Sequence, residues 1–212
     1  KSDDAQDNND DAQQTAGHPI EGGTFVYAIE EPITSLNWYN NNSTDLGKQV
    51  FSNLYDPMWK NNADGSLDYR LAKNVDISED GTTYTLTLRD DIYWSDGEKI
   101  TTDDIVFTLD TLVEPEVAPS TASGYKVDGE FCSYEKVSDT EIVFTIGRAS
   151  NLFKKALGAL YVLPAHCFEG VAATEVLTCE QNDTISTSGA FVVDSFNVGE
   201  KLVCVKNDKY YR

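Results

Sequence analysis

The residues that decide the fold are Leu71-Ala72-Lys73-Asn74-Val75-Asp76-Ile77, followed by Asp80-Gly81 and then by Tyr84-Thr85-Leu86-Thr87-Leu88-Arg89. Both longer runs contain strand-forming residues, and an Asp-Gly pair between such runs is a strong signal for a β-hairpin. Apolar and polar residues alternate in the second run, as expected of a strand with one buried face. The sequence therefore predicts antiparallel strands across residues 71–89.

A capped helix is predicted after this hairpin. Trp94-Ser95-Asp96-Gly97 predicts a second turn, and Thr101-Thr102-Asp103-Asp104 predicts the start of a helix. Thr101 and Asp104 have the spacing of a capping box, with Asp in place of the usual Glu or Gln. Three residues at helical spacing are expected to form its apolar face, namely Ile105, Leu109 and Leu112.

Strand and helix patterns continue on both sides of this stretch. Toward the C-terminus we expect strands at 131–137 and 141–146, short helices at 151–157 and from Ala165, and a strand pair at 191–193 and 202–205. Toward the N-terminus we expect a buried strand at 24–29, a polar loop at 35–44, and a helix that Thr44 caps and that runs to Leu54. These patterns predict a mixed α/β (α+β) protein.

The composition excludes several classes of protein. The 212 residues include 36 acidic and 16 basic ones, so the formal net charge is -20. This charge argues against binding to nucleic acid or to an anionic membrane surface, because both favour a basic protein surface. No apolar run approaches the roughly 20 residues that are needed to span a bilayer.

Cysteine spacing leaves the redox state open. The four cysteines are Cys132, Cys167, Cys179 and Cys204. None forms a C-x-x-C pair, so the spacing predicts neither a zinc site nor thioredoxin-like chemistry. Two disulfides of an exported protein and four partly buried thiols are both compatible with the sequence.

No catalytic or metal-binding pattern is found in the sequence. The chain has no G-x-S-x-G, P-loop or G-x-G-x-x-G motif. Asp76-x-Ser78-x-Asp80-Gly81 resembles the start of an EF-hand loop, but Thr87 stands where the loop needs Glu. His166 precedes Cys167, yet adjacency alone does not make a catalytic dyad. We therefore expect no enzyme activity, no catalytic residue, no metal and no cofactor.

The stretch from Leu71 to Leu112 resembles the signature of family 5 bacterial extracellular solute-binding proteins, the oligopeptide-, dipeptide- and nickel-binding group. The matching parts are the Leu-Ala start, the Asp-Gly hairpin, and the Trp94 turn with its capped helix. Val162-Leu163-Pro164-Ala165-His166 and the segment 202–211 resemble further parts of the family, so the resemblance covers residues 22–212. Departures from the family pattern include Trp38, Thr187, Ser188 and Ala190.

The resemblance implies a lobe of the periplasmic-binding-protein type II-like fold with an inserted β-rich subdomain. Residues 1–22 would form a disordered acidic tether. Residues 23–55 and 180–212 would form the hinge-proximal α/β part of lobe I, and residues 56–179 the inserted α+β subdomain. Members of the family continue into a second lobe, which we expect this chain to lack.

Two segments are expected to contact ligand. In the resembling family the loop after the first strand contributes to the cleft, and here that loop contains Trp38, Tyr39, Asn40, Asn41, Asn42 and Ser43. Its amides and hydroxyl would pair with a peptide backbone, while an aromatic ring would form an apolar wall. The second segment is Thr187, Ser188 and Gly189, whose small residues suit close approach of a ligand. For each segment the alternative is a loop or turn that contacts no ligand.

The implied function is that of the substrate-binding component of an ABC importer. Such a protein would capture a peptide, or another small-molecule ligand such as a nickel complex, haem, an opine or an oligosaccharide, and deliver it to a membrane permease. We expect a monomer that is extracellular, as a cell-surface lipoprotein or a periplasmic protein. A lipid anchor upstream of Lys1 is a hypothesis, and no other membrane contact is expected.

Two other classes of function stay open at this point. The first is a sensory or chaperone-like peptide-binding domain that uses the same fold without transport. The second is an extracellular acid hydrolase, which needs a pair of carboxylates with different pKa values in one pocket.

Overall fold

The computed structural model describes residues 22–30, 32–41, 45–117 and 120–212, without the side chains of Asn41 and Leu46. The chain divides into two units, Lys1–Glu30 and Glu31–Arg212. The predicted acidic tether lies outside the described residues, except for Gly22. Among the described residues, no helix combines the length and the hydrophobicity that a membrane span requires.

The strand predicted at 24–29 is wrong. Residues 22–29 form no strand, and Phe25 and Val26 are 88% and 85% exposed. High strand propensity reflects how well a side chain fits a pleated, half-buried surface, and a strand also needs a partner for its backbone. None of the strands in the described residues pairs with this segment, so its residues have the composition of a strand without its hydrogen bonds.

The largest sheet among the described residues is antiparallel and has the strand order β3 (Ala72–Ile77), β4 (Thr83–Leu88), β8 (Glu141–Thr145), β7 (Ser133–Ser138). The predicted hairpin is confirmed, since β3 pairs with β4 across the Asp-Gly turn. Between β4 and β8, Tyr84 lies opposite Phe144 and Leu86 lies opposite Ile142. All four side chains are buried, so this face of the sheet forms part of the core. The strands predicted at 131–137 and 141–146 are confirmed as β7 and β8.

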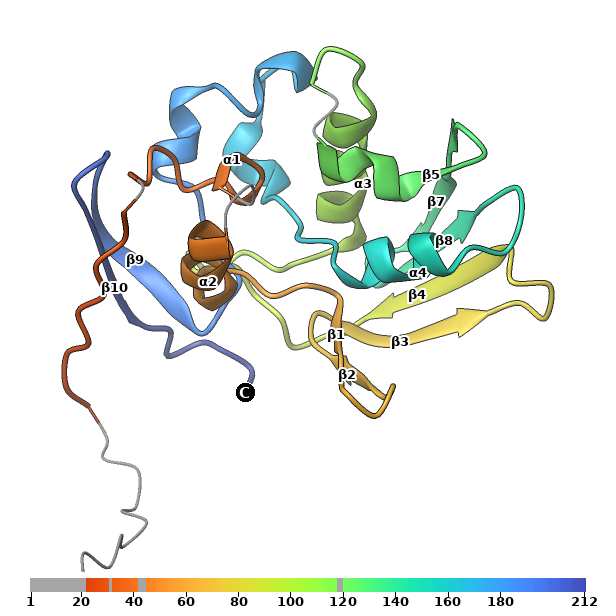
Figure 1. The fold of residues 1–212 in the computed structure, drawn as a ribbon, viewed down its shortest axis with the longest axis horizontal. Helices are drawn as coiled ribbons and strands as arrows, with labels where there is room; N and C mark the ends of the chain where they lie inside the picture. Colours follow the sequence, from red (N-terminus) through yellow and green to blue (C-terminus); the bar gives the residue numbers. More distant parts are fainter. Residues whose placement is uncertain (1–21, 31, 42–44, 118–119) are drawn as a thin grey trace, which may run out of the picture. The chain divides into compact units, whose positions relative to one another are not determined.

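Two helices pack beside this sheet (Figure 1). The ring of Phe153 in α4 (Asn151–Gly158) lies 5.1 Å from the ring of Tyr84 and 6.2 Å from that of Phe144. Helix α3 (Thr102–Val113) packs against β7. The predicted apolar face of α3 is confirmed, because three of its residues are fully buried, namely Ile105, Leu109 and Leu112.

The capping box predicted at the start of α3 is confirmed, and it extends into tertiary structure. The side chain of Thr101 accepts a hydrogen bond from the Asp103 amide, and the Asp104 carboxylate accepts one from the Thr101 amide at 2.9 Å. The same carboxylate accepts a second hydrogen bond from the Ala165 amide, also at 2.9 Å. Burial raises the pKa of Asp104, and these two backbone hydrogen bonds oppose that rise. Asp104 therefore joins the start of α3 to the segment around Ala165.

One turn later, Thr108 makes a second connection to the same segment. Its hydroxyl donates to the carbonyl of Asp104 at 2.6 Å and accepts from the amide of Leu163 at 2.8 Å. Thr108 is fully buried, so both hydrogen bonds are shielded from water. After this segment the predicted short helix is confirmed as the 3-10 turn η2 (Ala165–Phe168).

The N-terminal part of the larger unit contains two helices. Helix α2 (Asp45–Leu54) confirms the predicted helix, although its predicted cap, Thr44, lies outside the described residues. The predicted loop at 35–44 is wrong in part, because Trp38–Asn41 forms the short helix α1. The Asn37 side chain accepts a hydrogen bond from the Tyr39 amide at 2.9 Å, and Asn favours this local pairing at a helix start. Trp38 and Tyr39 are buried.

The predicted C-terminal strand pair is confirmed as a hairpin of β9 (Phe191–Asn197) and β10 (Lys201–Lys206). In Figure 1 it lies apart from the four-stranded sheet, with α2 next to β9. The remaining described elements are small: β1 (Trp59–Asn61) with β2 (Leu67–Tyr69), β5 (Lys126–Val127) with β6 (Glu130–Phe131), and the 3-10 turns η1 (Ser120–Tyr125), η3 (Ala173–Glu175) and η4 (Glu180–Asp183).

The end of α2 meets the segment before β9 at very short range. The amides of Ser188 and Gly189 both donate to the carbonyl of Leu54, at 3.0 and 2.8 Å. A Cβ atom at position 189 would lie 2.4 Å from the carbonyl oxygen of Asn53 and 2.6 Å from the carbonyl carbon of Leu54. Backbone cannot move aside as a flexible side chain does, so only glycine fits here.

Replacing Asp104 by Ala should lower the free energy of unfolding by about 2 to 4 kcal/mol, because a helix cap is lost and the partly buried Ala165 amide loses its acceptor. Urea denaturation followed by circular dichroism measures this change. Asp103→Ala is the matched control, since Asp103 is mostly exposed and its carboxylate contacts only Lys136 among the described ion pairs. The control should cost less than about 1 kcal/mol, and equal losses in the two variants would contradict the role of Asp104.

Replacing Gly189 by Ala should also destabilise the protein, by about 1 to 3 kcal/mol, because the added methyl group overlaps backbone atoms of α2. Gly147→Ala is the control, because a Cβ atom there has no neighbour within 4 Å. Thermal unfolding of the two variants gives the comparison. A G189A protein that melts at the same temperature as G147A would show that the two backbones separate readily.

Candidate ligand-binding site

The segment that contains Thr187 is held by backbone and side chains of the Trp94–Gly97 turn. The Ser95 amide donates to the Thr187 carbonyl at 2.8 Å, and the Thr187 amide donates to the Ser95 hydroxyl at 3.0 Å. The turn itself depends on Gly97, whose φ of 105° is strained for any other residue. One backbone hydrogen bond and one hydrogen bond to a side chain therefore join this segment to the turn.

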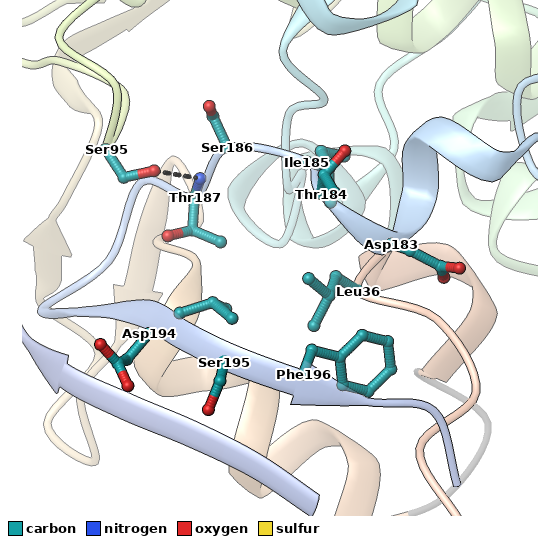
Figure 2. Close-up of a pocket in the computed structure, with 11 residues that line it drawn as sticks. Leu36, Ser95, Asp183, Thr184, Ile185, Ser186, Thr187, Asp194, Ser195 and Phe196 are labelled. Atoms are coloured by element: carbon teal, nitrogen blue, oxygen red, sulfur yellow. Dashed lines mark hydrogen bonds between the residues drawn. The ribbon is translucent and has the colours of Figure 1, made fainter.

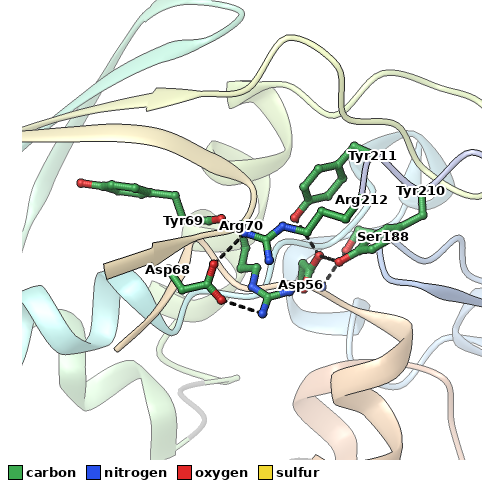
Figure 3. Close-up of polar contacts among 8 residues, drawn as sticks. All are labelled: Asp56, Asp68, Tyr69, Arg70, Ser188, Tyr210, Tyr211 and Arg212. Carbon is green, nitrogen blue, oxygen red and sulfur yellow. Dashed lines mark hydrogen bonds and ion pairs between the residues drawn. The ribbon is translucent and has the colours of Figure 1, made fainter. Parts of the chain in front are cut away.

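Asp56, whose carboxylate is buried, contacts the same segment through its backbone amide (Figure 3). The Asp56 amide donates to the Ser188 hydroxyl at 3.2 Å, while the Asp56 carboxylate accepts hydrogen bonds from Tyr210 and Tyr211 at 2.6 and 2.9 Å. Burial and the neighbouring Asp56 carboxylate raise the pKa of both tyrosines, which keeps their hydroxyls protonated as donors. The residues after β10 are thereby fixed next to Ser188.

An ion-pair chain continues from this carboxylate to the C-terminal residue. Arg70 lies between Asp56, at 3.9 Å, and Asp68, at 2.7 Å. Asp68 also pairs with Arg212 at 2.7 Å. Burial alone would lower the pKa of Arg70, but the two carboxylates outweigh it and raise that pKa. Each of these charged groups has an oppositely charged partner within the cluster. We therefore interpret the cluster as a structural contact and not as a ligand-binding site.

A hollow of about 360 Å³ lies between the Thr187 segment and β9 (Figure 2). It is open to solvent, and its lining combines hydroxyl groups, a few apolar side chains and two aspartates. The lining residues are Leu36, Ser95, Asp183, Thr184, Ile185, Ser186, Thr187, Val193, Asp194, Ser195 and Phe196. Its size is at the lower end of the range for small-molecule sites.

Leu36, which precedes the first predicted contact segment (Trp38 to Ser43), is one of the residues that line this hollow. The Leu36 amide donates to the Asn182 carbonyl at 2.9 Å, and the Asn37 side-chain amide donates to that of Asn182 at 2.8 Å. The hydroxyl of Tyr55 donates to the Leu36 carbonyl at 2.9 Å. The residues before α1 and those before Thr187 therefore lie next to each other, although about 150 positions separate them in sequence.

The structure places the predicted contact residues in different surroundings. Trp38 stacks on Tyr161 with ring centroids 3.5 Å apart, and the Tyr39 hydroxyl donates to the Tyr161 carbonyl at 2.8 Å. Asn40 is exposed, and its side chain donates to Ser35 and to the Leu177 carbonyl. The side chain of Asn41, and Asn42 and Ser43 entirely, lie outside the described residues.

Of the second predicted segment, Thr187 lines the hollow, while Ser188 and Gly189 contact α2 behind it. Contact of either segment with a ligand stays a prediction. The structure adds lining residues that the sequence did not single out, chiefly Asp183–Ile185 and Val193–Phe196. Ser95 belongs to the turn motif, where it was interpreted only as part of the fold. For β9, no signal in the sequence indicates which residues face a hollow.

His166 and Cys167 lie next to Asp96, but the three residues do not have the geometry of a catalytic triad. The His166 Nε2 atom is 2.8 Å from an Asp96 carboxylate oxygen and 3.5 Å from the Cys167 sulfur. A triad needs its base to contact nucleophile and carboxylate through different ring nitrogens. Here both groups meet the same nitrogen, so the imidazole cannot pass a proton between them in that way. All four cysteines are free thiols in this structure.

Comparison with known proteins supports the interpretation as a binding protein. Residues 67–212 match the family described as bacterial extracellular solute-binding proteins, family 5 middle. The oligopeptide-binding protein AppA of Bacillus subtilis is 25% identical over 210 residues, which are 98% of this chain and 38% of AppA.

Solved structures agree with the sequence comparison. The ABC transporter substrate binding protein CtaP of Listeria monocytogenes superposes with a TM-score of 0.77 and 26% identity over 86% of this chain and 36% of CtaP. The B. subtilis AppA structure in complex with a nonapeptide superposes with a TM-score of 0.73 and 23% identity over 85% of this chain and 35% of that one. The predicted type II-like fold is thus confirmed. The chain spans under two-fifths of each relative's length, and it belongs to the family 5 bacterial extracellular solute-binding proteins.

Proposed function

We propose that this chain provides part of the ligand-contacting surface of a peptide-binding component of an ABC importer. The observation that carries the proposal is the hollow beside the hydrogen-bonded Thr187 segment, in a member of a solute-binding family. Peptides are favoured because AppA is an oligopeptide-binding protein and was crystallised with a nonapeptide. The role is binding and not catalysis, with delivery of the ligand to a membrane permease outside the cytoplasm.

The chemistry of the hollow suits a peptide. Its hydroxyl groups can donate or accept hydrogen bonds, and a peptide backbone offers both kinds of partner along its length. Leu36 and Phe196 lie side by side at one end and offer an apolar contact (Figure 2). The division into a hinge-proximal part and an inserted subdomain, the monomeric state and the lipid anchor upstream of Lys1 remain parts of this proposal.

The charge of the hollow favours a cationic group on the ligand. Two of its lining residues are aspartates, Asp183 and Asp194, and both are exposed. No basic residue is among the lining residues that the structure describes. A lysine side chain or a free peptide N-terminus would meet a carboxylate there without having to displace an existing cation.

Two peptides that differ only by Lys or Gln at one position test this proposal. Asp194→Asn should weaken binding of the Lys peptide about two- to fivefold, as expected for an exposed ion pair, and leave the Gln peptide unaffected. Affinities can be measured by NMR titration of the 212-residue chain with each peptide.

Asp76→Asn is the matched control, because it makes the same charge change on β3, and Asp76 is exposed and outside the hollow. Equal weakening by both variants would show a general effect of net charge. If neither peptide binds the chain at millimolar concentration, the peptide proposal for this surface is wrong. A normal rate of peptide uptake in cells that lack the gene would favour a binding domain without transport.

A further inference from the structure

Three potential metal ligands of different chemistry meet at one point beside the hollow. They are a carboxylate oxygen of Asp96, the Nε2 atom of His166 and the sulfur of Cys167, and all three atoms lie within 4.8 Å of one another. Asp96 belongs to the turn after Trp94, whereas the other two belong to η2. Both Asp96 and His166 are more than a third exposed at the side chain, so an ion has access from solvent.

The hydrogen bonds that these three groups could form with one another cannot all be made at once. A neutral imidazole nitrogen either carries one proton or accepts one. The Nε2 atom of His166 has a carboxylate oxygen at 2.8 Å and a sulfur at 3.5 Å, so one hydrogen position serves two neighbours. A cation among the three atoms would contact each of them directly.

The spacing suits a tetrahedral zinc ion. Ordinary Zn–N, Zn–O and Zn–S bond lengths place ligand nitrogen and oxygen about 3.4 Å apart, and nitrogen and sulfur about 3.6 Å apart. The observed nitrogen-to-sulfur distance is 3.5 Å. The nitrogen-to-oxygen distance of 2.8 Å would have to widen by roughly half an ångström. Exposed side chains on a turn and a 3-10 segment can make that adjustment by small rotations.

Neighbouring groups hold the three ligands in place. The second oxygen of Asp96 accepts the Glu98 amide at 3.0 Å, and the Ser186 hydroxyl donates to the ligand oxygen itself. This oxygen has a second lone pair that can bind a metal ion. Hydrogen bonds from surrounding groups commonly orient metal ligands in this way. Asp104 fixes the backbone just before His166 through the Ala165 amide, and its carboxylate adds negative charge near the site.

We propose that Asp96, His166 and Cys167 form a binding site for Zn²⁺, with water as the fourth ligand. Imidazole, thiolate and carboxylate are the ligands that zinc takes in proteins, and hard cations such as Mg²⁺ avoid sulfur. Binding releases the thiol proton to the solvent, because the thiolate is the ligand. The sequence did not predict this site, since its ligands do not follow a C-x-x-C or comparable spacing and meet only after folding.

Titration of the 212-residue chain with Zn²⁺ under reducing conditions tests the proposal. Calorimetry should give one site per chain, and Cys167→Ser should weaken binding at least about tenfold. Co²⁺ in place of Zn²⁺ should give a thiolate-to-cobalt charge-transfer band that is absent in Cys167→Ser. Asp96→Asn should weaken Zn²⁺ binding but keep the band at saturating Co²⁺.

Two control variants distinguish this site from other side chains that could bind zinc. Cys179→Ser removes a thiol of similar partial exposure, and His18→Ala removes the histidine of the acidic N-terminal segment. Both should bind Zn²⁺ as the unchanged chain does. Circular dichroism of each variant shows whether it is folded. The proposal is overturned if a folded Cys167→Ser chain binds with unchanged affinity, if His18→Ala abolishes binding, or if the unchanged chain binds no Zn²⁺.

Discussion

The buried carboxylate of Asp104 accepts hydrogen bonds from the Thr101 and Ala165 amides, and through this contact α3 meets the segment that carries His166. It starts α3 and at the same time fixes the residue before His166. His166 in turn meets Asp96, and the Asp96 carboxylate accepts the hydroxyl of Ser186 at the edge of the hollow. Asp104 and Asp96 together thus connect the start of α3, the η2 turn and the segment that contains Ser186. Its burial is unfavourable on its own, and the backbone donors compensate for it.

Local structure was largely predictable from sequence, because it depends on neighbours along the chain. The Asp-Gly hairpin, the Thr101 cap and the apolar face of α3 all follow from periodicity and turn chemistry over a few residues. The prediction of a strand at 24–29 was wrong for the opposite reason. A strand requires a neighbouring strand to which its backbone can hydrogen-bond, and composition alone does not supply one. Helix α1 was missed because Asn-rich stretches favour loops and helix starts alike.

The candidate site was predictable only in part. Thr187 was predicted as a contact residue from the small residues of a family-like segment; it lines the hollow, and its contact with a ligand stays a prediction. The contributions of Asp194 and Phe196 depend on how the β9–β10 hairpin is placed, which no short-range pattern encodes. The same holds for the meeting of Asp96 with His166, which lie 70 positions apart. Sites of this kind depend on tertiary contacts, so the residues that surround them become apparent only in the folded chain.

The exposed segment around Phe25 and Val26 has a consequence for the behaviour of the chain in solution. Strand-forming apolar residues with unpaired backbone groups are a template on which another copy can add. The formal net charge of -20 opposes that encounter through repulsion between copies. Dissolved salt screens such repulsion over about 10 Å at 0.1 M. We therefore expect electrostatic repulsion to keep copies of this chain apart, and high ionic strength to favour their association.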